Sequence, residues 1–296
     1  MYKMLEDYKK YLQNELEVSK STYDAYVRDV NIFINYVDIS VSHNIHNVTV
    51  DNIEGFSNYL EKNGKTPATI NRCLASVRSF YKFLKISGLE INNPAKSYHY
   101  KKSVRKLPEI LTNNDVDKLL GSPDISTPKG CRDKAMLELL YATGMRVSEL
   151  IELNIEDVNI KNGFVCCNSG SNSRIIPIYK TAKKALKDYM LRVQPYYSTD
   201  DNEALFINMN GTRLTRQGFW KILKKYADEV GLKGDITPHT VRHSFAAHLV
   251  ENGASLDDVK EMLGHSDVAS TQIYAQIVNN RFKNVYNRCH PKAKSV

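Results

Sequence analysis

The sequence lacks any long run of apolar residues, and its few cysteines follow no familiar spacing. None of its apolar stretches approaches the roughly 20 residues that a membrane-spanning helix needs. The charged N-terminus also lacks the apolar stretch of a signal peptide. The five cysteines are odd in number and scattered, which argues against a disulfide framework or a zinc site. We therefore expect a soluble, cytoplasmic protein with reduced, structural cysteines and no membrane association.

Length and composition predict a globular chain with an excess of positive charge. The 296 residues suffice for one large or two ordinary domains, and a hydrophobic content of 42% is enough for real cores. The net charge is +8: Lys and Arg outnumber Asp and Glu by 12 to 11 in residues 1–100, and by 29 to 22 in residues 101–296. A basic chain attracts polyanions, of which nucleic acid is the commonest. Charge alone leaves a merely solvated basic surface as the alternative.

Hydrophobic periodicity divides the chain into a helical part and a mixed part. Apolar residues at helical spacing predict a small bundle in the first hundred residues. Its four helices are expected at about 5–16, 19–37, 50–60 and 68–84. The pattern then ends at Asn92-Asn93-Pro94, and a stretch rich in Lys and Arg follows. We predict a helical domain at 1–97, a basic linker at 98–107 and a second domain at 108–296.

The second domain is predicted to be mainly helical with a small β-sheet. Thr112 is typical of an N-cap for its first helix, and 132–141 is a strongly apolar helix. Two strands, at 164–167 and 174–178, flank a polar turn. The remaining elements are helices at about 180–192, 214–230, 240–252 and 255–262, and a short strand at 205–207.

Five residues of the second domain carry groups suited to metal-free phosphoryl transfer. That reaction needs a nucleophile, cationic donors to the non-bridging oxygens, and groups that accept and donate protons. A tyrosine hydroxyl can attack, arginine forks fit phosphate oxygens in pairs, and histidines can move protons. Each residue alone also has an ordinary explanation as a surface, capping or packing residue. The five candidates are Arg146, His239, Arg242, His265 and Tyr274.

Local spacing strengthens three of these candidates. Arg146 follows Thr143-Gly144, where an apolar helix stops and a new one starts, and helix N-termini favour anions. His239 and Arg242 are three residues apart and would share one face of a helix. Glu149, three residues after Arg146, is expected to orient that arginine rather than to react. His243 is expected to pack beside Arg242.

Together these motifs resemble those of the tyrosine recombinase family, and most closely its Xer-type site-specific recombinases. The family's Thr-Gly-x-Arg-x-x-Glu-Leu is matched at Arg146, and its His-x-x-Arg is matched at His239 and Arg242. Leu-Gly-His is matched at His265, and Thr-x-x-Tyr at Tyr274. The resemblance covers nearly the whole chain, with the motifs in family order.

The resemblance implies a fold and an activity. The fold would be a helical, SAM-like core-binding domain and an α+β catalytic domain of tyrosine recombinase type, which clamp a duplex between them. Tyr274 would form a covalent 3′-phosphotyrosine, without metal or high-energy cofactor. Arg146, Arg242, His239 and His265 would stabilise the transition state, with His239 the favoured proton acceptor.

The resemblance also implies partners. These are double-stranded DNA with paired half-sites and further copies of the chain, as a tetramer on two duplexes, or a paralogous recombinase. Residues 279–289 would dock on a neighbouring protomer, unless they pack on their own domain. Whether the chain serves a chromosome, plasmid, phage or mobile element stays open. The linker cations, which would neutralise phosphates, are Lys101, Lys102, Arg105 and Lys106.

One position departs from the family pattern. Ser169 stands where the family places a catalytic lysine in the β-hairpin, and no lysine occurs between Lys161 and Lys180. Serine cannot replace an ammonium group as acid for the leaving 5′ oxygen. Lys161 reaching in, protonation by water or histidine, and a protein that binds but cleaves poorly are the three alternatives. We expect slowed cleavage with retained binding. A non-catalytic DNA-binding or architectural protein and a type IB topoisomerase are the rival functions.

Overall fold

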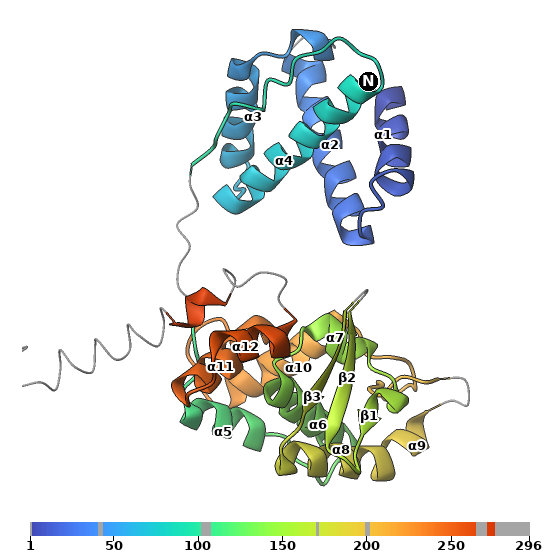
Figure 1. The fold of residues 1–296 in the computed structure, drawn as a ribbon, viewed down its shortest axis with the longest axis vertical. Helices are drawn as coiled ribbons and strands as arrows, with labels where there is room; N and C mark the ends of the chain where they lie inside the picture. Colours follow the sequence, from blue (N-terminus) through green and yellow to red (C-terminus); the bar gives the residue numbers. More distant parts are fainter. Residues whose placement is uncertain are drawn as a thin grey trace, which may run out of the picture. The chain divides into compact units, whose positions relative to one another are not determined.

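Two units, each with its own hydrophobic core, make up the chain. The computed structural model describes residues 2–40, 44–101, 108–169, 172–198, 202–264 and 271–275 (Figure 1). The first unit is Met1–Arg105 and the second is Lys106–Val296. Within the described part, no helix combines the length and the apolar character needed to cross a membrane. Most of the predicted linker at 98–107 lies outside the described residues, so its bounds stay a prediction.

The first unit is a bundle of four helices, which confirms the expectation from periodicity. The side chain of Thr49 caps α3, and Thr66 caps α4 just before a proline at its first turn. These caps explain why the two helices begin where they do. The helices are α1 (Tyr2–Asn14), α2 (Lys20–Ser40), α3 (Val50–Lys62) and α4 (Pro67–Ile86), with a short 3-10 helix at Ile45–Asn47.

Buried aromatic rings join the four helices of this unit. The ring of Phe33 on α2 meets Phe56 on α3 edge-on, with centroids 5.2 Å apart. Tyr8 on α1 meets Phe80 on α4 in the same way, also at 5.2 Å. Such edge-to-face pairs contribute beyond their buried area. The first unit therefore has an aromatic-rich hydrophobic core of its own.

The second unit is mainly helical and carries one small sheet, as predicted. Its sheet is antiparallel in the order β1-β2-β3, with Val165 opposite Ile176 in the centre. Thr112 caps the first helix through a reciprocal capping box with Asp115. The elements are α5 (Asn113–Gly121), α6 (Pro128–Thr143), α7 (Val147–Glu152), β1 (Val158–Asn159), β2 (Phe164–Ser169), β3 (Asn172–Pro177), α8 (Lys180–Arg192), α9 (Gln194–Tyr197), α10 (Arg216–Glu229), α11 (Pro238–Glu251) and α12 (Leu256–Leu263), with a 3-10 turn at Ile155–Asp157.

Helix α6 is the centre of the second unit. It packs against α5, α8 and α11, and most of its residues are buried on every side. Burial on all sides is typical of a helix that is apolar around its whole circumference. Three charged residues of this helix are buried: Arg132 pairs with Asp133 at 2.6 Å, Tyr226 donates to the same carboxylate, and Glu138 pairs with Lys134 at 2.7 Å. The helix thus holds α7 and α11, which carry the candidate site, on one scaffold.

The strand predicted at 205–207 is wrong, and a short strand before β2 went unpredicted. Residues 204–207 make only isolated bridges, Asn154 with Ala204 and Ile207 with Arg213. Leu205 and Phe206 are fully buried in the core, and this burial explains the apolar run that resembled a β-strand in the sequence. Strand β1 has only two residues, too few to produce the alternation that reveals a strand in sequence.

Candidate active site

Arg146 sits at the junction between α6 and α7, where the sequence predicted a helix start. Gly144 ends α6 in the left-handed conformation, with φ of 58°. A Cβ on Gly144 would lie 2.2 Å from a ring carbon of Phe245, so both backbone and space require glycine here. Arg146 then occupies the N-cap of α7, with 39% of its side chain exposed. This leaves part of its guanidinium accessible to an anion.

Glu149 holds Arg146 from the first turn of α7. Its Oε1 accepts from Nη1 of Arg146 at 3.0 Å, and its Oε2 accepts from the backbone N–H of Arg146 at 2.7 Å. Burial would raise the pKa of this carboxyl, but hydrogen bonds from Arg174 and from the Arg146 backbone, with both positive charges, hold the pKa below its usual range. Glu149 is therefore ionised at neutral pH and orients Arg146, as predicted.

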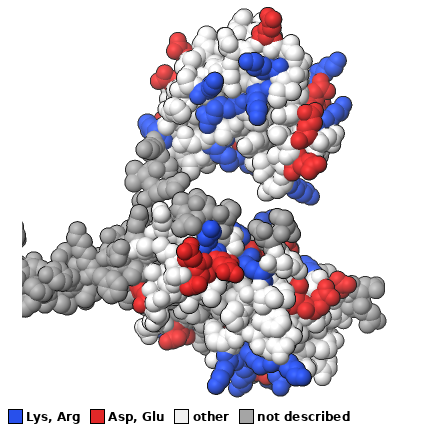
Figure 2. Space-filling view, in the orientation of Figure 1, with Lys and Arg blue, Asp and Glu red and all other residues white. Residues whose placement is uncertain are grey.

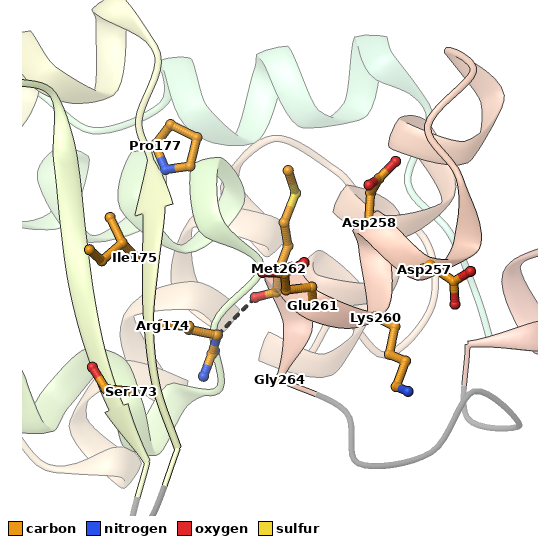
Figure 3. A pocket seen from close by; sticks show the side chains of 10 residues that line it. All are labelled: Ser173, Arg174, Ile175, Pro177, Asp257, Asp258, Lys260, Glu261, Met262 and Gly264. Carbon is orange, nitrogen blue, oxygen red and sulfur yellow. Dashed lines mark hydrogen bonds between the residues drawn. The ribbon is translucent and has the colours of Figure 1, made fainter.

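Arg174 on β3 is a member of this cluster that sequence reasoning missed. Its Nη2 and Nη1 donate to the two oxygens of Glu149 at 2.7 and 3.1 Å, and its Nε donates to the carbonyl of Met262 at 2.8 Å. It is one of the residues that line a recess of about 910 Å³ between β3 and α12. Figure 3 shows its side chain reaching from β3 toward Met262 on α12. An arginine within a strand of apolar residues was the signal available in the sequence.

Arg242 on α11 lies buried between the C-terminal ends of two helices. Its Nη1 donates to the carbonyl of Gly144 at 2.6 Å, and its Nη2 donates to the carbonyl of Leu263 at 2.8 Å. Helix C-termini carry partial negative charge, which stabilises a cation there. Burial, reinforced by the nearby charge of Arg146, lowers the pKa of Arg242 to about 10. The guanidinium still carries its charge at pH 7.

The two arginines from distant parts of the chain converge at the end of α12. Arg146 reaches the carbonyl of Gly264 at 3.4 Å, next to the Leu263 carbonyl that Arg242 binds. A Cβ on Gly264 would lie 2.8 Å from Nη1 of Arg174, so the tight approach again needs glycine. The cluster brings three arginines against one carboxylate. This positive excess favours a bound anion such as a phosphate.

Tyr274 lies in the same region, and its hydroxyl contacts a histidine. The side chain is only 1% exposed, and its hydroxyl is 3.0 Å from Nδ1 of His243 on α11. Burial raises the pKa of the phenol, while the positive charge of Arg242 opposes that shift. The predicted nucleophile therefore lies close enough to the buried arginine to sense its charge. The sequence predicted only that His243 packs beside Arg242. In the structure, the imidazole of His243 contacts the Tyr274 hydroxyl.

The two predicted histidines differ in what the structure describes. His239 is exposed near the start of α11, one turn before His243, and the two ring centroids are 6.3 Å apart. His265 lies outside the described residues, as does segment 279–289. It directly follows Gly264, which caps α12 with φ of 63°. The structure thus brings Arg146, Arg242 and Tyr274 together, with His239 on the neighbouring turn of α11.

Ser169 is the last residue of β2 and pairs with Asn172 across the hairpin. Residues 170 and 171, at the tip, lie outside the described part. Lys161 precedes β2, and a strand rises about 3.3 Å per residue, so the ends of β2 are roughly 16 Å apart. The backbone carbonyl of Lys161 accepts a hydrogen bond from Nζ of Lys183 at 3.0 Å, at the end of the hairpin opposite Ser169. Lys161 therefore lies near the end of β2 opposite Ser169, and its replacement of the missing lysine stays a prediction.

The predicted DNA-binding cations are only partly described. Lys101 forms an exposed ion pair with Glu61 at 2.9 Å, while Lys102, Arg105 and Lys106 lie outside the described residues. Arg72 pairs with the buried Asp29, and Arg78 donates to the carbonyl of Ala95 at 3.3 Å. Both arginines of α4 are therefore engaged within their own unit, although Arg72 stays partly exposed.

A further group of basic side chains lies on α8. Lys180, Lys184 and Lys187 are exposed and spaced to share one side of the helix. Figure 2 shows basic side chains gathered at this end of the second unit, and Figure 1 places α8 away from the C-terminal end of β2. This group adds to the attraction for polyanions but lies apart from the arginine cluster.

Comparisons with known families cover nearly the whole chain. Residues 5–88 match the phage integrase N-terminal SAM-like domain, and residues 109–281 match the phage integrase family. The tyrosine recombinase XerD of Listeria innocua is 43% identical, over 99% of this chain and all of its own length. That of Oceanobacillus iheyensis is 44% identical, over 98% of both.

Solved structures show the same fold. XerA recombinase is 25% identical, with a TM-score of 0.55 over 98% of this chain and 99% of its own. XerH bound to a palindromic difH substrate gives a TM-score of 0.75 at 22% identity, over 96% of this chain and 83% of its own. A lambda integrase dimer bound to a core site gives a TM-score of 0.73 at 17% identity, over 93% of this chain and 94% of its own. With both halves matched by family models and full-length relatives above 40% identity, the chain belongs to the phage integrase family of tyrosine recombinases.

Proposed function

We propose that the chain is a site-specific DNA recombinase that cuts and rejoins duplex strands through a covalent bond between Tyr274 and a DNA 3′ phosphate. The observation that carries this proposal is the convergence of Arg146, Arg242 and Tyr274 from three distant segments. Family membership supports the same activity. The rival functions, an architectural DNA-binding protein and a type IB topoisomerase, differ in the chemistry or the order of motifs.

Each residue has a defined task in the proposed reaction. Arg146 and Arg242 bind the non-bridging oxygens of the scissile phosphate, where charge grows in the transition state. The phenol oxygen of Tyr274 attacks phosphorus as the bond to the 5′ oxygen breaks, and His239 is proposed to accept the phenol proton. His265 would add a further donor to the phosphate.

The reaction conserves its bond energy. One phosphodiester is exchanged for a phosphotyrosine ester, so no high-energy cofactor is needed. The leaving 5′ oxygen takes up one proton, and a free 5′ hydroxyl from another strand later reverses the step. Because Ser169 cannot donate like an ammonium group, we propose that protonation of the leaving oxygen is slow in this chain while DNA binding is retained.

The partners follow from the same proposal. DNA-bound relatives include XerH on its difH substrate and a lambda integrase dimer on a core site. For this chain we propose paired half-sites in duplex DNA, bound by a tetramer on two duplexes or together with a paralogue, in the cytoplasm. The first domain (1–97), the linker (98–107) and the second domain (108–296) would contact the duplex together. Phosphate contacts come from Lys101, Lys102, Arg105 and Lys106.

A nicked duplex that traps the covalent intermediate tests the activity. We expect a protein–DNA adduct that survives denaturation, and its complete loss in Tyr274→Phe with DNA binding retained. Tyr196→Phe is the matched control, because it removes the hydroxyl of an exposed tyrosine on α9 that has no proposed role. Binding without adduct in the parent protein would support the architectural alternative. Relaxation of supercoiled DNA without any site preference would support the topoisomerase.

A further inference from the structure

The contact between His243 and Tyr274 has no assigned role in the proposed reaction. Nδ1 of His243 lies 3.0 Å from the Tyr274 hydroxyl, and the two rings are tilted at 49° with centroids 5.7 Å apart. His243 is half-buried on α11, directly after the buried Arg242. The contact therefore joins the predicted nucleophile to the helix that carries the phosphate clamp.

Both partners of this contact are neutral at physiological pH. Burial, with the nearby His239 and the charge of Arg242, lowers the pKa of His243 to about 4. Burial raises the pKa of Tyr274 above its ordinary value, against the pull of Arg242. A phenol that keeps its proton and an imidazole that has lost one make a neutral hydrogen bond. Proton transfer from the phenol to His243 is strongly uphill here, which argues against His243 as the general base.

We propose that His243 is a positioning residue for the nucleophile: its Nδ1 accepts a hydrogen bond from the Tyr274 hydroxyl and holds the phenol in the site of its own chain, beside Arg242. Because Nδ1 accepts, the ring proton is on Nε2. The effect on cleavage rests on the proposed function, whereas the effect on the phenol's position does not.

The same helix contains a second tyrosine–histidine pair, which serves as an internal comparison. Nδ1 of His248 lies 2.9 Å from the hydroxyl of Tyr141, and its Nε2 lies 3.0 Å from the carbonyl of Leu111. That pair is buried between α6, α11 and the segment before α5. His248→Leu therefore removes a histidine–tyrosine hydrogen bond from α11, together with the bond to Leu111, without touching Tyr274.

Chemical accessibility tests the position of the phenol in the full chain without DNA. Tyr274 is nitrated with tetranitromethane, and the modified peptide is quantified by mass spectrometry. We expect slow nitration in the parent protein and at least about fivefold faster nitration in His243→Leu, the equivalent of one neutral hydrogen bond. His243→Asn places a polar atom near the position of Nδ1, so it should restore protection. His248→Leu should leave nitration of Tyr274 slow.

Cleavage of a nicked duplex in single turnover tests the consequence for the reaction. In His243→Leu we expect the rate of covalent adduct formation to fall about five- to tenfold, with an unchanged Kd for DNA. His243→Asn should recover to within about twofold of the parent. Rates are compared at a temperature well below every variant's Tm, so that His248→Leu controls for a general loss of stability.

Distinct outcomes overturn the two proposals. Unchanged nitration in His243→Leu, or equal losses in His243→Leu and His243→Asn, shows that the contact is only packing. Faster nitration with unchanged cleavage also overturns the positioning role. If the parent protein forms no adduct, the proposed recombinase activity fails. The nitration series then still decides whether His243 holds the phenol.

Discussion

Arg174 donates a hydrogen bond to each carboxylate oxygen of Glu149, with Nη2–Oε2 at 2.7 Å and Nη1–Oε1 at 3.1 Å. Only 10% and 5% of the two side chains are exposed, so this two-point ion pair is shielded from solvent. The same carboxylate holds Arg146, which faces the proposed phosphate. One acidic group thus fixes two cations that approach from β3 and from α7.

Replacing Glu149 with Gln should impair both stability and catalysis. The change removes the carboxylate that pairs with both Arg146 and Arg174, and it leaves Arg174 buried without this counterion. We expect a loss of about 3 kcal/mol in the free energy of unfolding, from urea titration. Adduct formation should fall on the order of 10- to 100-fold, because Arg146 loses its orientation. Glu152→Gln, on the exposed side of α7, is the control and should change neither. An active, stable Glu149→Gln protein would contradict the orienting role.

Replacing Ser169 with Lys should accelerate cleavage. The lysine restores an ammonium group at the end of β2, where the family places its acid for the 5′ oxygen. Since general acids contribute 10²-fold or more, we expect adduct formation on nicked DNA to rise at least about tenfold. Ser173→Lys adds the same charge on the opposite strand of the hairpin and should not produce this gain. Equal rates in parent and Ser169→Lys would show that protonation of the leaving oxygen is not limiting.

Replacing Gly144 with Ala should destabilise the second unit. The new methyl group would meet the ring of Phe245 at 2.2 Å, in a backbone conformation that costs non-glycine residues extra. We expect a loss of about 3 kcal/mol in the free energy of unfolding, measured by denaturant titration. Gly121→Ala meets nothing within 4 Å at the end of α5 and should be tolerated. Similar stability for both variants would contradict this account of the junction.

Removing the linker charges should weaken the salt dependence of DNA binding. Each phosphate neutralised contributes about 0.9 to the slope of log K against log salt concentration, so three lost contacts lower it by about 3. The variant changes Lys102, Arg105 and Lys106 to Gln, and the slope comes from binding titrations between 50 and 200 mM salt. The matched control changes Lys221, Lys224 and Lys225 on α10, two of which already pair with acids. An equal change in both variants would mean that only net charge matters.

His243 predicts a pH dependence of stability. Its pKa is about 4 in the folded chain against an ordinary value of 6.5, so the unfolded chain binds a proton first as the pH falls. Its contribution is complete above pH 6.5 and is lost progressively toward pH 4. That contribution is at most about 3 kcal/mol and is smaller where solvent screens the ring. Unfolding of the parent and of His243→Asn should therefore differ most in slope between pH 6.5 and 4.5. If the stability of the two proteins depended on pH in the same way, His243 would have the same pKa in the folded and unfolded chains.

Local signals in the sequence predicted most of the fold. A capping threonine, helical periodicity and the helix-ending Gly144 each involve only a few neighbouring residues, so they can be recognised in the sequence alone. Periodicity predicted the four helices of the first unit, Thr112 predicted the start of the first helix of the second unit, and a polar turn between two strand-like runs predicted its hairpin. The segment at 205–207 was not, because burial against the core produces the same apolar run as a strand.

The site was predicted only where a motif is local. Arg146, His239 and Arg242 stand in short patterns along the chain, whereas Arg174 meets Glu149 from 25 residues away and His243 meets Tyr274 from 31. Such contacts depend on how β3, α7 and α11 pack, which no short window of sequence contains. The orienting carboxylate was predicted, but its second arginine and the partner of the phenol were not.

The carbonyls that Arg242 and Arg146 bind have a mechanical consequence. At the end of α12, Arg242 binds the carbonyl of Leu263, and Arg146 binds the carbonyl of Gly264, which caps that helix. Each guanidinium also has a partner outside α12, because Arg242 donates to the Gly144 carbonyl and Arg146 donates to Glu149. The proposed phosphate clamp is therefore anchored from two sides, and a change in the position of α12 alone would strain both arginines together.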